Sequence, residues 1–245
     1  MDIFGDAFSD YIRGNIKGRI TVRTNISDEE KLPVAYFFRS PGQMPPWEKL
    51  VLEKCRGRIL DVGAGAGSHS IALQAAGMQP LAIDISPGAV EVMKSRGVKN
   101  VLCRDFFSYT PEKGFDTILF LMNGAGIAGK LDRVERLLRH ASDMLNEGGV
   151  IYIESTDLIY LYEEEDGSIR VPMNESYYGE VEYVLGYRGK YSRPFPWLFL
   201  DPGNLAGIAD DCGLSTEVIY RGEDYNYVAE IKKTGSAEAG STSDL

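Results

Sequence analysis

Short apolar runs alternate with amphipathic stretches between residues 47 and 153. Runs long enough for buried strands occur at 58–62, 80–84, 98–103, 115–121 and 150–153. Stretches with the apolar spacing or the end signals of helices occur at 47–55, 70–76, 87–96 and 134–145. Alternating strands and helices are typical of a parallel sheet covered by helices on both faces. We therefore predict an α/β fold built on a doubly wound, mostly parallel sheet.

The chain departs from this alternation on both sides. Residues 3–12 place apolar side chains on one helical stripe, which predicts an amphipathic helix, and we assign residues 1–46 to an N-terminal helical cap. After the fifth strand, apolar and polar residues alternate over residues 181–188, as in an antiparallel strand. An antiparallel β insert is therefore predicted at about 158–200, within a main domain at 47–233.

The C-terminal part contains signals for one helix and two strands. Asp201 and Pro202 are suited to begin a helix, which is predicted to end at Cys212. Strands at about 215–220 and 225–232 are predicted to form a hairpin. Residues 234–245 are small and polar, so we predict a disordered tail there.

The composition is that of an ordinary soluble protein. Of the 245 residues, 44% are hydrophobic and 25% are charged, and the apolar runs are shorter than a membrane span. The acidic N-terminal stretch is unlike a secretory signal, and the three cysteines form neither a disulfide framework nor a Cys-x-x-Cys site, so we expect a cytoplasmic protein. The net charge of −10 argues against nucleic acid as a partner. The one basic cluster, interpreted as a solvated face, consists of Arg13, Lys17, Arg19 and Arg23.

A glycine-rich turn, Asp61-Val62-Gly63-Ala64-Gly65-Ala66-Gly67-Ser68, joins the first strand to its helix. Glycines there permit positive φ and close approach of a ligand to the backbone. The spacing is G-x-G-x-G, and Ser68 stands where the dinucleotide fingerprint requires its last glycine. Asp61 would repel a pyrophosphate but suits a cofactor with an ammonium group, such as S-adenosylmethionine. The alternative is an ordinary strand-to-helix turn without a ligand.

Two further acids follow the next two strands. Asp84 ends the second strand, where a doubly wound sheet places the acid that binds ribose hydroxyls. Asp105 and Phe106 follow the third strand, where an acid and an aromatic ring could bind the adenine amino group and face. The alternatives are a turn-capping Asp84 and a solvated Asp105.

With these residues the chain resembles the class I S-adenosylmethionine-dependent methyltransferases, and the resemblance extends over residues 47–233. It implies a seven-stranded, Rossmann-like sheet with a reversed last strand. It also implies that the backbone from Gly63 through Ala64 to Gly65 borders the methionine part, with Gly67 among the cofactor-binding residues. Ile85 and Phe106 would contact the adenine, and Met122 and Asn123 would form the methyl-transfer face. Arg39 is a candidate for the methionine carboxylate, because a guanidinium binds a carboxylate in bidentate fashion; the alternative is a surface arginine. The segments 36–40 and 195–199 resemble segments of bacterial methyltransferases.

The substrate end of the site is the least defined. Methyl transfer from a sulfonium requires in-line positioning above all, so a catalytic base can be absent. Candidates for a base are His69, Glu154 and Asp157, which follow the glycine turn or the fifth strand. Candidate substrate contacts in the tyrosine-rich insert are Tyr178, Tyr183 and Trp197. Strand packing or a homodimer surface would explain these aromatic residues as well.

The resulting hypothesis is methyl transfer to a small-molecule acceptor by in-line displacement. Two alternatives are a methyltransferase that acts on a protein or RNA and a binding module for S-adenosylmethionine without catalysis. An NAD-dependent oxidoreductase is disfavoured by Ser68 and Asp61.

Overall fold

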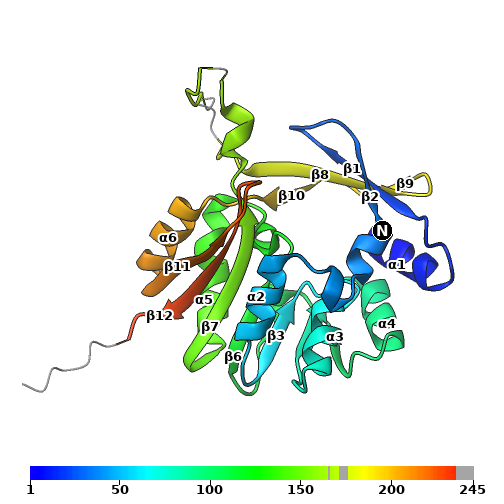
Figure 1. Ribbon diagram of the computed structural model, residues 1–245, viewed down its shortest axis with the longest axis horizontal. Helices are drawn as coiled ribbons and strands as arrows, with labels where there is room; N and C mark the ends of the chain where they lie inside the picture. The colour runs from blue at the N-terminus through cyan, green and yellow to red at the C-terminus, as the bar shows by residue number, and fades with distance from the viewer. Residues whose placement is uncertain (165, 171–175, 236–245) are drawn as a thin grey trace, which may run out of the picture.

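A seven-stranded sheet forms the body of the molecule (Figure 1), in a computed structural model that describes residues 1–164, 166–170 and 176–235. Its strand order is β11-β12-β7-β6-β3-β4-β5. The strands are β3 (Ile59–Val62), β4 (Leu81–Asp84), β5 (Asn100–Cys103), β6 (Phe115–Phe120), β7 (Leu145–Thr156), β11 (Leu214–Arg221) and β12 (Asn226–Lys233). Strands β3 to β7 pair in parallel, whereas β12 is antiparallel to both its neighbours. The predicted mostly parallel sheet with a reversed last strand is confirmed.

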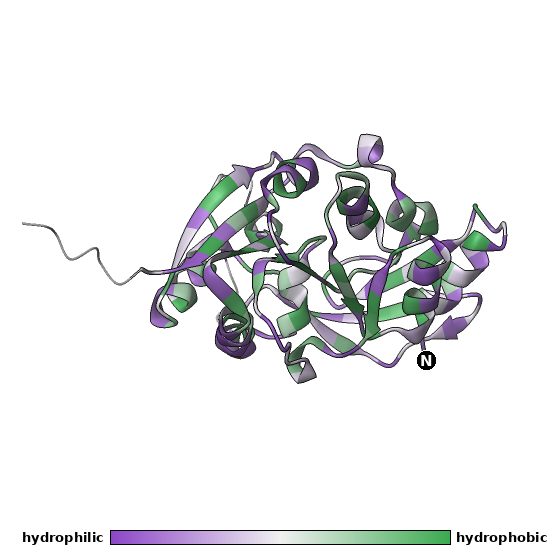
Figure 2. Ribbon diagram, turned by 90° about the horizontal axis from the view of Figure 1, so that it is seen from below, coloured by the Kyte–Doolittle hydropathy of each residue, from purple (hydrophilic) through white to green (hydrophobic). Residues whose placement is uncertain are grey.

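Helices cover both faces of this sheet. They are α2 (Pro46–Lys54), α3 (Ser68–Ala75), α4 (Pro87–Ser95), α5 (Val134–Asp143) and α6 (Pro202–Asp211). Successive residues of β6 point to opposite faces, so Ile118 packs in the same cluster as α5 and α6, and Leu119 packs with α2 and α3. Seen from below, the strands in the middle of the body are mostly hydrophobic, and hydrophilic residues lie on the outer helices and connecting segments (Figure 2). This is the pattern of a sheet buried between two helix layers.

A second, antiparallel sheet combines the N-terminal segment with the predicted insert. Its order is β10-β8-β1-β2, and β9 pairs with β8. The strands are β1 (Arg19–Thr24), β2 (Glu30–Pro33), β8 (Glu180–Tyr187), β9 (Lys190–Tyr191) and β10 (Phe195–Leu198). We call these strands the upper sheet, because they lie above the body in Figure 1.

The N-terminal segment is only partly helical. Helix α1 (Ile3–Ile12) was predicted, but residues 19–33 form β1 and β2, which the expectation of a helical cap did not include. Ile20 and Val22 of β1 face the core with Leu185, so the strand is stabilised by a partner far away in the sequence. The 3₁₀ segments η1 (Val34–Phe38) and η2 (Pro41–Gln43) then lead to α2.

Four of the other connections contain short 3₁₀ segments. They are η3 (Phe106–Ser108), η4 (Gly124–Ala128), η5 (Leu131–Arg133) and η6 (Leu158–Tyr162). The predicted disordered tail, residues 234–245, lies outside the described residues from 236 onward. Within the described residues, the helices are all too short or too polar to cross a membrane.

Candidate functional site

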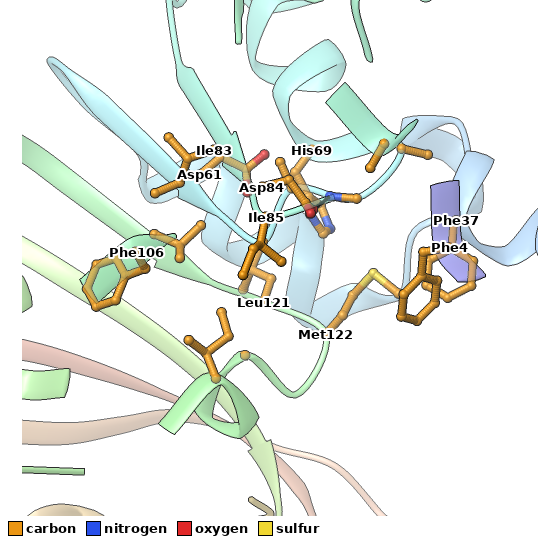
Figure 3. A pocket seen from close by; sticks show the side chains of 18 of the residues that line it. Phe4, Phe37, Asp61, His69, Ile83, Asp84, Ile85, Phe106, Leu121 and Met122 are labelled. Carbon is orange, nitrogen blue, oxygen red and sulfur yellow. Dashed lines mark hydrogen bonds between the residues drawn. The ribbon is translucent and has the colours of Figure 1, made fainter. Parts of the chain in front are cut away.

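A pocket of about 380 Å³ opens at the carboxyl ends of β3, β4 and β6, beside the glycine-rich turn. This edge of a doubly wound sheet is where ligands bind. Phe106 lies at one end of the pocket, Phe4, Phe37 and Met122 lie at the other, and Asp84 lies between them (Figure 3). The pocket therefore has two largely apolar ends and a carboxylate near its middle.

The glycine-rich turn takes the conformation expected of it. Gly63, Gly65 and Gly67 have φ values of 67°, 57° and 81°, in the left-handed region. Gly63, Ala64 and Gly65 line the pocket. Gly67 lies behind the lining, where a Cβ would come within 2.9 Å of Met93 Cγ and Val98 Cγ2. Its lack of a side chain therefore allows α3 to begin against α4.

Asp61 and Asp84 both line the pocket. Asp61 is 2% exposed, and its Oδ2 accepts a hydrogen bond of 2.7 Å from Ser70 Oγ; burial raises the pKa of Asp61. Asp84 accepts backbone N–H bonds of 2.8 Å from Gly65 and Ser86, one on each oxygen. Burial also raises the pKa of Asp84, although these two N–H bonds oppose the shift. The Asp84 carboxylate is thus held in one orientation by the two turns that border the pocket.

Apolar and acidic residues lie together at the far end of the pocket. Ile85, Asp105 and Phe106 all line it, as the resemblance implies. Ile85 is 70% exposed, whereas Phe106 is 4% exposed and packs edge-on against Phe120, with 5.1 Å between ring centroids. An exposed isoleucine next to a fixed carboxylate suits a ligand that has a flat apolar ring beside a hydroxylated sugar.

Arg39 lies behind the pocket, and the alternative of a surface arginine is wrong. Its side chain is 9% exposed and pairs with Glu48, which is 1% exposed. Its guanidinium also stacks on Tyr36, with Cζ 3.8 Å from the ring centroid. Nε and Nη1 are buried and have no hydrogen-bond partner within the described part of the chain. Buried donors are nearly always satisfied, so the Arg39 guanidinium keeps hydrogen-bonding capacity that the described residues do not use.

His69 joins this buried charge pair to the pocket. It lines the pocket, and its Nε2 lies 3.0 Å from Glu48 Oε2. Burial alone would lower the pKa of His69, but the bond to Glu48 and the charges of Asp61, Glu48 and Glu154 raise it above its ordinary value. Glu48 therefore connects Arg39 to a pocket-lining histidine.

Glu154 supports the turn after β6 from outside the pocket lining. Its carboxylate accepts Met122 N at 2.6 Å and Trp47 Nε1 at 3.1 Å. Met122 and Asn123 both have positive φ, 57° and 55°, and Thr156 Oγ1 donates to Asn123 Oδ1 at 3.0 Å. Burial raises the pKa of Glu154 to about 7. Met122 lines the pocket, and Asn123 follows it just outside the lining.

The remaining candidates lie at different depths. Trp197 lines the pocket, and Tyr183 lies behind it, with 6.5 Å between ring centroids. Tyr178 donates to Asp157 Oδ1 at 2.7 Å and packs on Tyr177, outside the pocket lining. Asp157 also caps η6 through Ile159 N. The structure thus brings Trp197 to the pocket and gives Tyr178 and Asp157 contacts with each other.

Several pocket residues were not singled out by the sequence. Phe4 and Phe8 of α1 and Phe37 of η1 line the pocket, and Glu48 links Arg39 to His69. A sequence signal existed for two of them, because Phe4 and Phe8 lie one turn apart on the apolar stripe of residues 3–12. What this stripe would cover could not be read from the chain.

Comparisons with known proteins agree with this geometry. A model described as a methyltransferase domain matches residues 59–149. The crystal structure of a SAM-dependent methyltransferase from Bacteroides fragilis, in complex with S-adenosyl-L-homocysteine, shares 40% sequence identity and has a TM-score of 0.88. That match covers 95% of this chain and 94% of the other.

Two more distant relatives extend the comparison. A cypemycin N-terminal methyltransferase from Streptomyces sp is 28% identical over 102 residues, which are 40% of this chain and 42% of that protein. The chain thus matches less than half the length of this curated relative. The sugar N-methyltransferase KedS8 from Streptoalloteichus sp ATCC 53650 shares 16% identity and a TM-score of 0.54, over 83% of this chain and 94% of the other, a likeness of fold alone. From the full-length match at 40% identity, together with the glycine-rich turn and the acids around the pocket, the chain belongs to the S-adenosylmethionine-dependent methyltransferases.

Proposed function

We propose that this methyltransferase holds S-adenosylmethionine across the pocket and transfers its methyl group to a small-molecule acceptor. The observation that carries the proposal is the aromatic cover of the pocket. Phe4, Phe8 and Phe37 from the N-terminal segment and Trp197 from β10 line it, and Phe8 lies close to Gly65 of the glycine-rich turn. A covered, largely apolar site suits a ligand small enough to be enclosed.

The residues around the pocket fit the parts of the cofactor in order. Asp84 would bind the ribose hydroxyls, since both its oxygens keep a free lone pair after accepting one N–H each. Ile85 and Phe106 would enclose the adenine, and Asp105 is suited to accept its amino group. Asp61 and the backbone of residues 63–65 would border the methionine part.

Arg39 would bind the methionine carboxylate. Its Nε and Nη1 are buried and lack a hydrogen-bond partner in the described part of the chain. The pairing with Glu48 holds the guanidinium in place, and Glu48 is in turn bound to the pocket-lining His69. Desolvated charge-assisted hydrogen bonds are about twice as strong as neutral ones, so this contact would contribute strongly to affinity.

S-adenosylmethionine, when bound, supplies an electrophilic methyl group on its sulfonium. The chain then needs to hold that group and the acceptor in line and to exclude water. Glu154 and Thr156 fix the Met122-Asn123 turn on the methyl-transfer face. Among the candidate bases, His69 lines the pocket, Glu154 contacts it through Met122, and Asp157 is engaged with Tyr178. We propose that positioning dominates and that His69 is the group placed to hold a proton at the pocket wall.

A binding experiment separates this cofactor assignment from others. Calorimetry with S-adenosyl-L-homocysteine and with NAD⁺ is expected to give binding of the first ligand only. Replacing Arg39 by methionine should raise the Kd for S-adenosyl-L-homocysteine by about 10-fold or more, because one charge-assisted hydrogen bond is lost. The same variant should bind 5′-methylthioadenosine with an unchanged Kd, because that ligand lacks the carboxylate.

Arg58→Met is the matched control, since its guanidinium stacks on Phe115, with Cζ 4.6 Å from the ring centroid, at the opposite end of the strands. An equal loss of affinity for both ligands in Arg39→Met would contradict the carboxylate assignment.

A labelling experiment tests the class of acceptor. Methyl-labelled S-adenosylmethionine and the protein are incubated with a cell extract, which is then divided by ultrafiltration. Label in the small-molecule fraction supports the proposal, and label confined to the protein or RNA fraction refutes it.

We also assign the protein to the cytoplasm. Cys55, Cys103 and Cys212 are free thiols, as expected in a reducing compartment. The net charge of −10 is likewise unsuited to a nucleic-acid partner.

A further inference from the structure

Helix α1 forms one wall of the pocket although it lies outside the seven-stranded body. Phe4 and Phe8 line the pocket, and their rings lie 5.4 Å and 5.1 Å from that of Phe37. A Cβ on Gly65 of the glycine-rich turn would lie 3.8 Å from Phe8 Cε2. The helix therefore reaches from the surface to the backbone on which the cofactor is proposed to lie.

The Asp2 carboxylate joins the beginnings of two helices. It caps α1 by accepting Gly5 N at 2.8 Å. It also accepts Ser86 Oγ at 2.7 Å and Gly88 N at 2.9 Å, at the start of α4. The positive ends of both helix dipoles thus face one negative charge, which is the favourable arrangement.

Ser86 connects Asp2 to the proposed ribose-binding acid. Its hydroxyl donates to Asp2, and its backbone N–H donates to Asp84 Oδ1 at 2.8 Å. The other oxygen of Asp84 is held by Gly65 N. A displacement of α1 that breaks the Asp2 contacts therefore acts on the turn that orients Asp84.

The two helices touch backbone to backbone beside this carboxylate. A Cβ added to Gly5 would come within 2.7 Å of Gly88 Cα, and one added to Gly88 would come within 2.5 Å of Gly5 Cα. Even a methyl group on either residue requires α1 to move away from α4. On its other side, α1 is tied to the upper sheet by more exposed ion pairs, such as Asp6 with Lys190 at 3.2 Å.

We propose that Asp2 is a positioning residue of the cofactor site: it clamps α1 to the start of α4, so that Phe4 and Phe8 cover the bound cofactor and slow its release. This rests on the proposed function, in which the pocket binds the cofactor. In the free protein, α1 opens and closes against α4, and the Asp2 contacts favour the closed arrangement. A bound cofactor adds contacts with Phe4 and Phe8 and favours it further.

The test uses the full chain with S-adenosyl-L-homocysteine as the probe. Stopped-flow fluorescence measures the dissociation rate constant, calorimetry measures Kd, and scanning fluorimetry measures the Tm of the ligand-free protein. Asp2→Asn keeps the size of the side chain but removes its charge and one acceptor, and the Cβ of Gly5→Ala would clash with the Asp2 carboxylate and with Gly88 Cα. The matched controls are Asp6→Asn on the same helix and Gly207→Ala on α6, where a Cβ would meet open space.

We expect the dissociation rate constant to rise about 10-fold in Asp2→Asn, because an amide leaves either Gly5 N or Gly88 N without an acceptor, and by a similar factor in Gly5→Ala, because α1 must move away from α4. Both control variants should keep the dissociation rate constant of the original protein. Hydrogen exchange of residues 3–12 should slow when S-adenosyl-L-homocysteine is added to the original protein. A merely structural role would lower the Tm of the variants and leave dissociation unchanged.

Unchanged dissociation in both Asp2→Asn and Gly5→Ala overturns the proposal. If Asp2→Asn does not fold, Gly5→Ala and Phe4→Ala decide, because Phe4→Ala removes the cover without touching the clamp. Asp84→Ala distinguishes the two levels of inference. If Asp84→Ala loses S-adenosyl-L-homocysteine binding while Asp2→Asn and Gly5→Ala keep the original dissociation rate constant, only the clamp is refuted. If Asp84→Ala binds S-adenosyl-L-homocysteine as the original protein does, the proposed cofactor site is refuted.

Discussion

Replacing Asp84 by asparagine tests the center of the proposed site with nearly the same side-chain shape. Each carboxylate oxygen accepts a backbone N–H at 2.8 Å, from Gly65 and from Ser86. An amide has one acceptor oxygen, so its NH₂ group must face one of these N–H donors in either orientation. The variant therefore leaves one backbone donor unsatisfied and one ribose hydroxyl without its charged acceptor.

The expected magnitudes follow from these contacts. A hydrogen bond to a charged group contributes about 1.5–3 kcal/mol, so the Kd for S-adenosyl-L-homocysteine should rise by about 10- to 100-fold. The unsatisfied N–H should lower the free energy of unfolding by about 1–3 kcal/mol. Calorimetry gives the first quantity, and urea denaturation of the ligand-free protein gives the second.

A deoxy ligand isolates the ribose contact. The analogue of S-adenosyl-L-homocysteine without ribose hydroxyls should bind the original protein weakly and should lose little further affinity in Asp84→Asn. Asp116→Asn is the control, because Asp116 also accepts two N–H donors, from Arg58 and Asn146, but at the other end of the strands. If Asp84→Asn weakened both ligands equally, Asp84 would be a structural acid and the ribose assignment would be refuted.

Two further predictions concern stability. Burial raises the pKa of Glu154 from 4.5 to about 7. Between these pH values the folded protein keeps a proton that the unfolded chain releases. Because of Glu154, the free energy of unfolding should therefore fall as the pH rises through this range. Relative to Glu154→Gln, the original protein should thus lose about 3 kcal/mol between pH 4.5 and 7 in urea titrations, and a pH-independent difference would contradict the raised pKa. Gly67→Ala combines positive φ with close contacts to Met93 and Val98 and should cost about 2–4 kcal/mol of unfolding free energy. Gly77→Ala, with φ of +84° and open space around it, should cost only about 1–2 kcal/mol in the same denaturation experiment, and equal costs would show that the Gly67 contacts relax freely.

The body of the fold and one half of the site could be predicted because their determinants are local. Residues 59–75 contain the strand, the turn and the helix in one continuous stretch, and the parallel order then brings Asp84 and Asp105 to the same edge. The other half depends on contacts between distant segments. Glu48 reads as an ordinary surface acid of an amphipathic helix, and its burial follows only from Arg39 and His69 lying on either side of it.

The N-terminal strands of the upper sheet could not be predicted for the same reason, whereas the strand at 181–188 could. Strand β1 has six residues, too few for a clear period, and its register with β8 pairs Val22 with Leu185. The alternation over residues 181–188 indicated β8, but the short segment of β1 gave no comparable signal and no indication of its partner. The Phe4 and Phe8 side chains acquire their place at the pocket only once this sheet and α4 have fixed α1.

The pairing of β1 with β8 also bears on how the protein is made. In the part of the chain that the structure describes, β1 pairs with β2 and β8, and β8 is synthesised after the first five strands of the body. During translation the N-terminal hairpin of β1 and β2 therefore lacks its β8 partner, and Val22 lacks Leu185, until residues 180–187 have been made. Contacts of such long sequence separation form slowly and leave apolar surface open to aggregation in the meantime. A nascent chain that ends before residue 180 contains β3 to β7 but lacks β11, β12 and the later strands of the upper sheet, so apolar surface on both sheets would then be open to a chaperone.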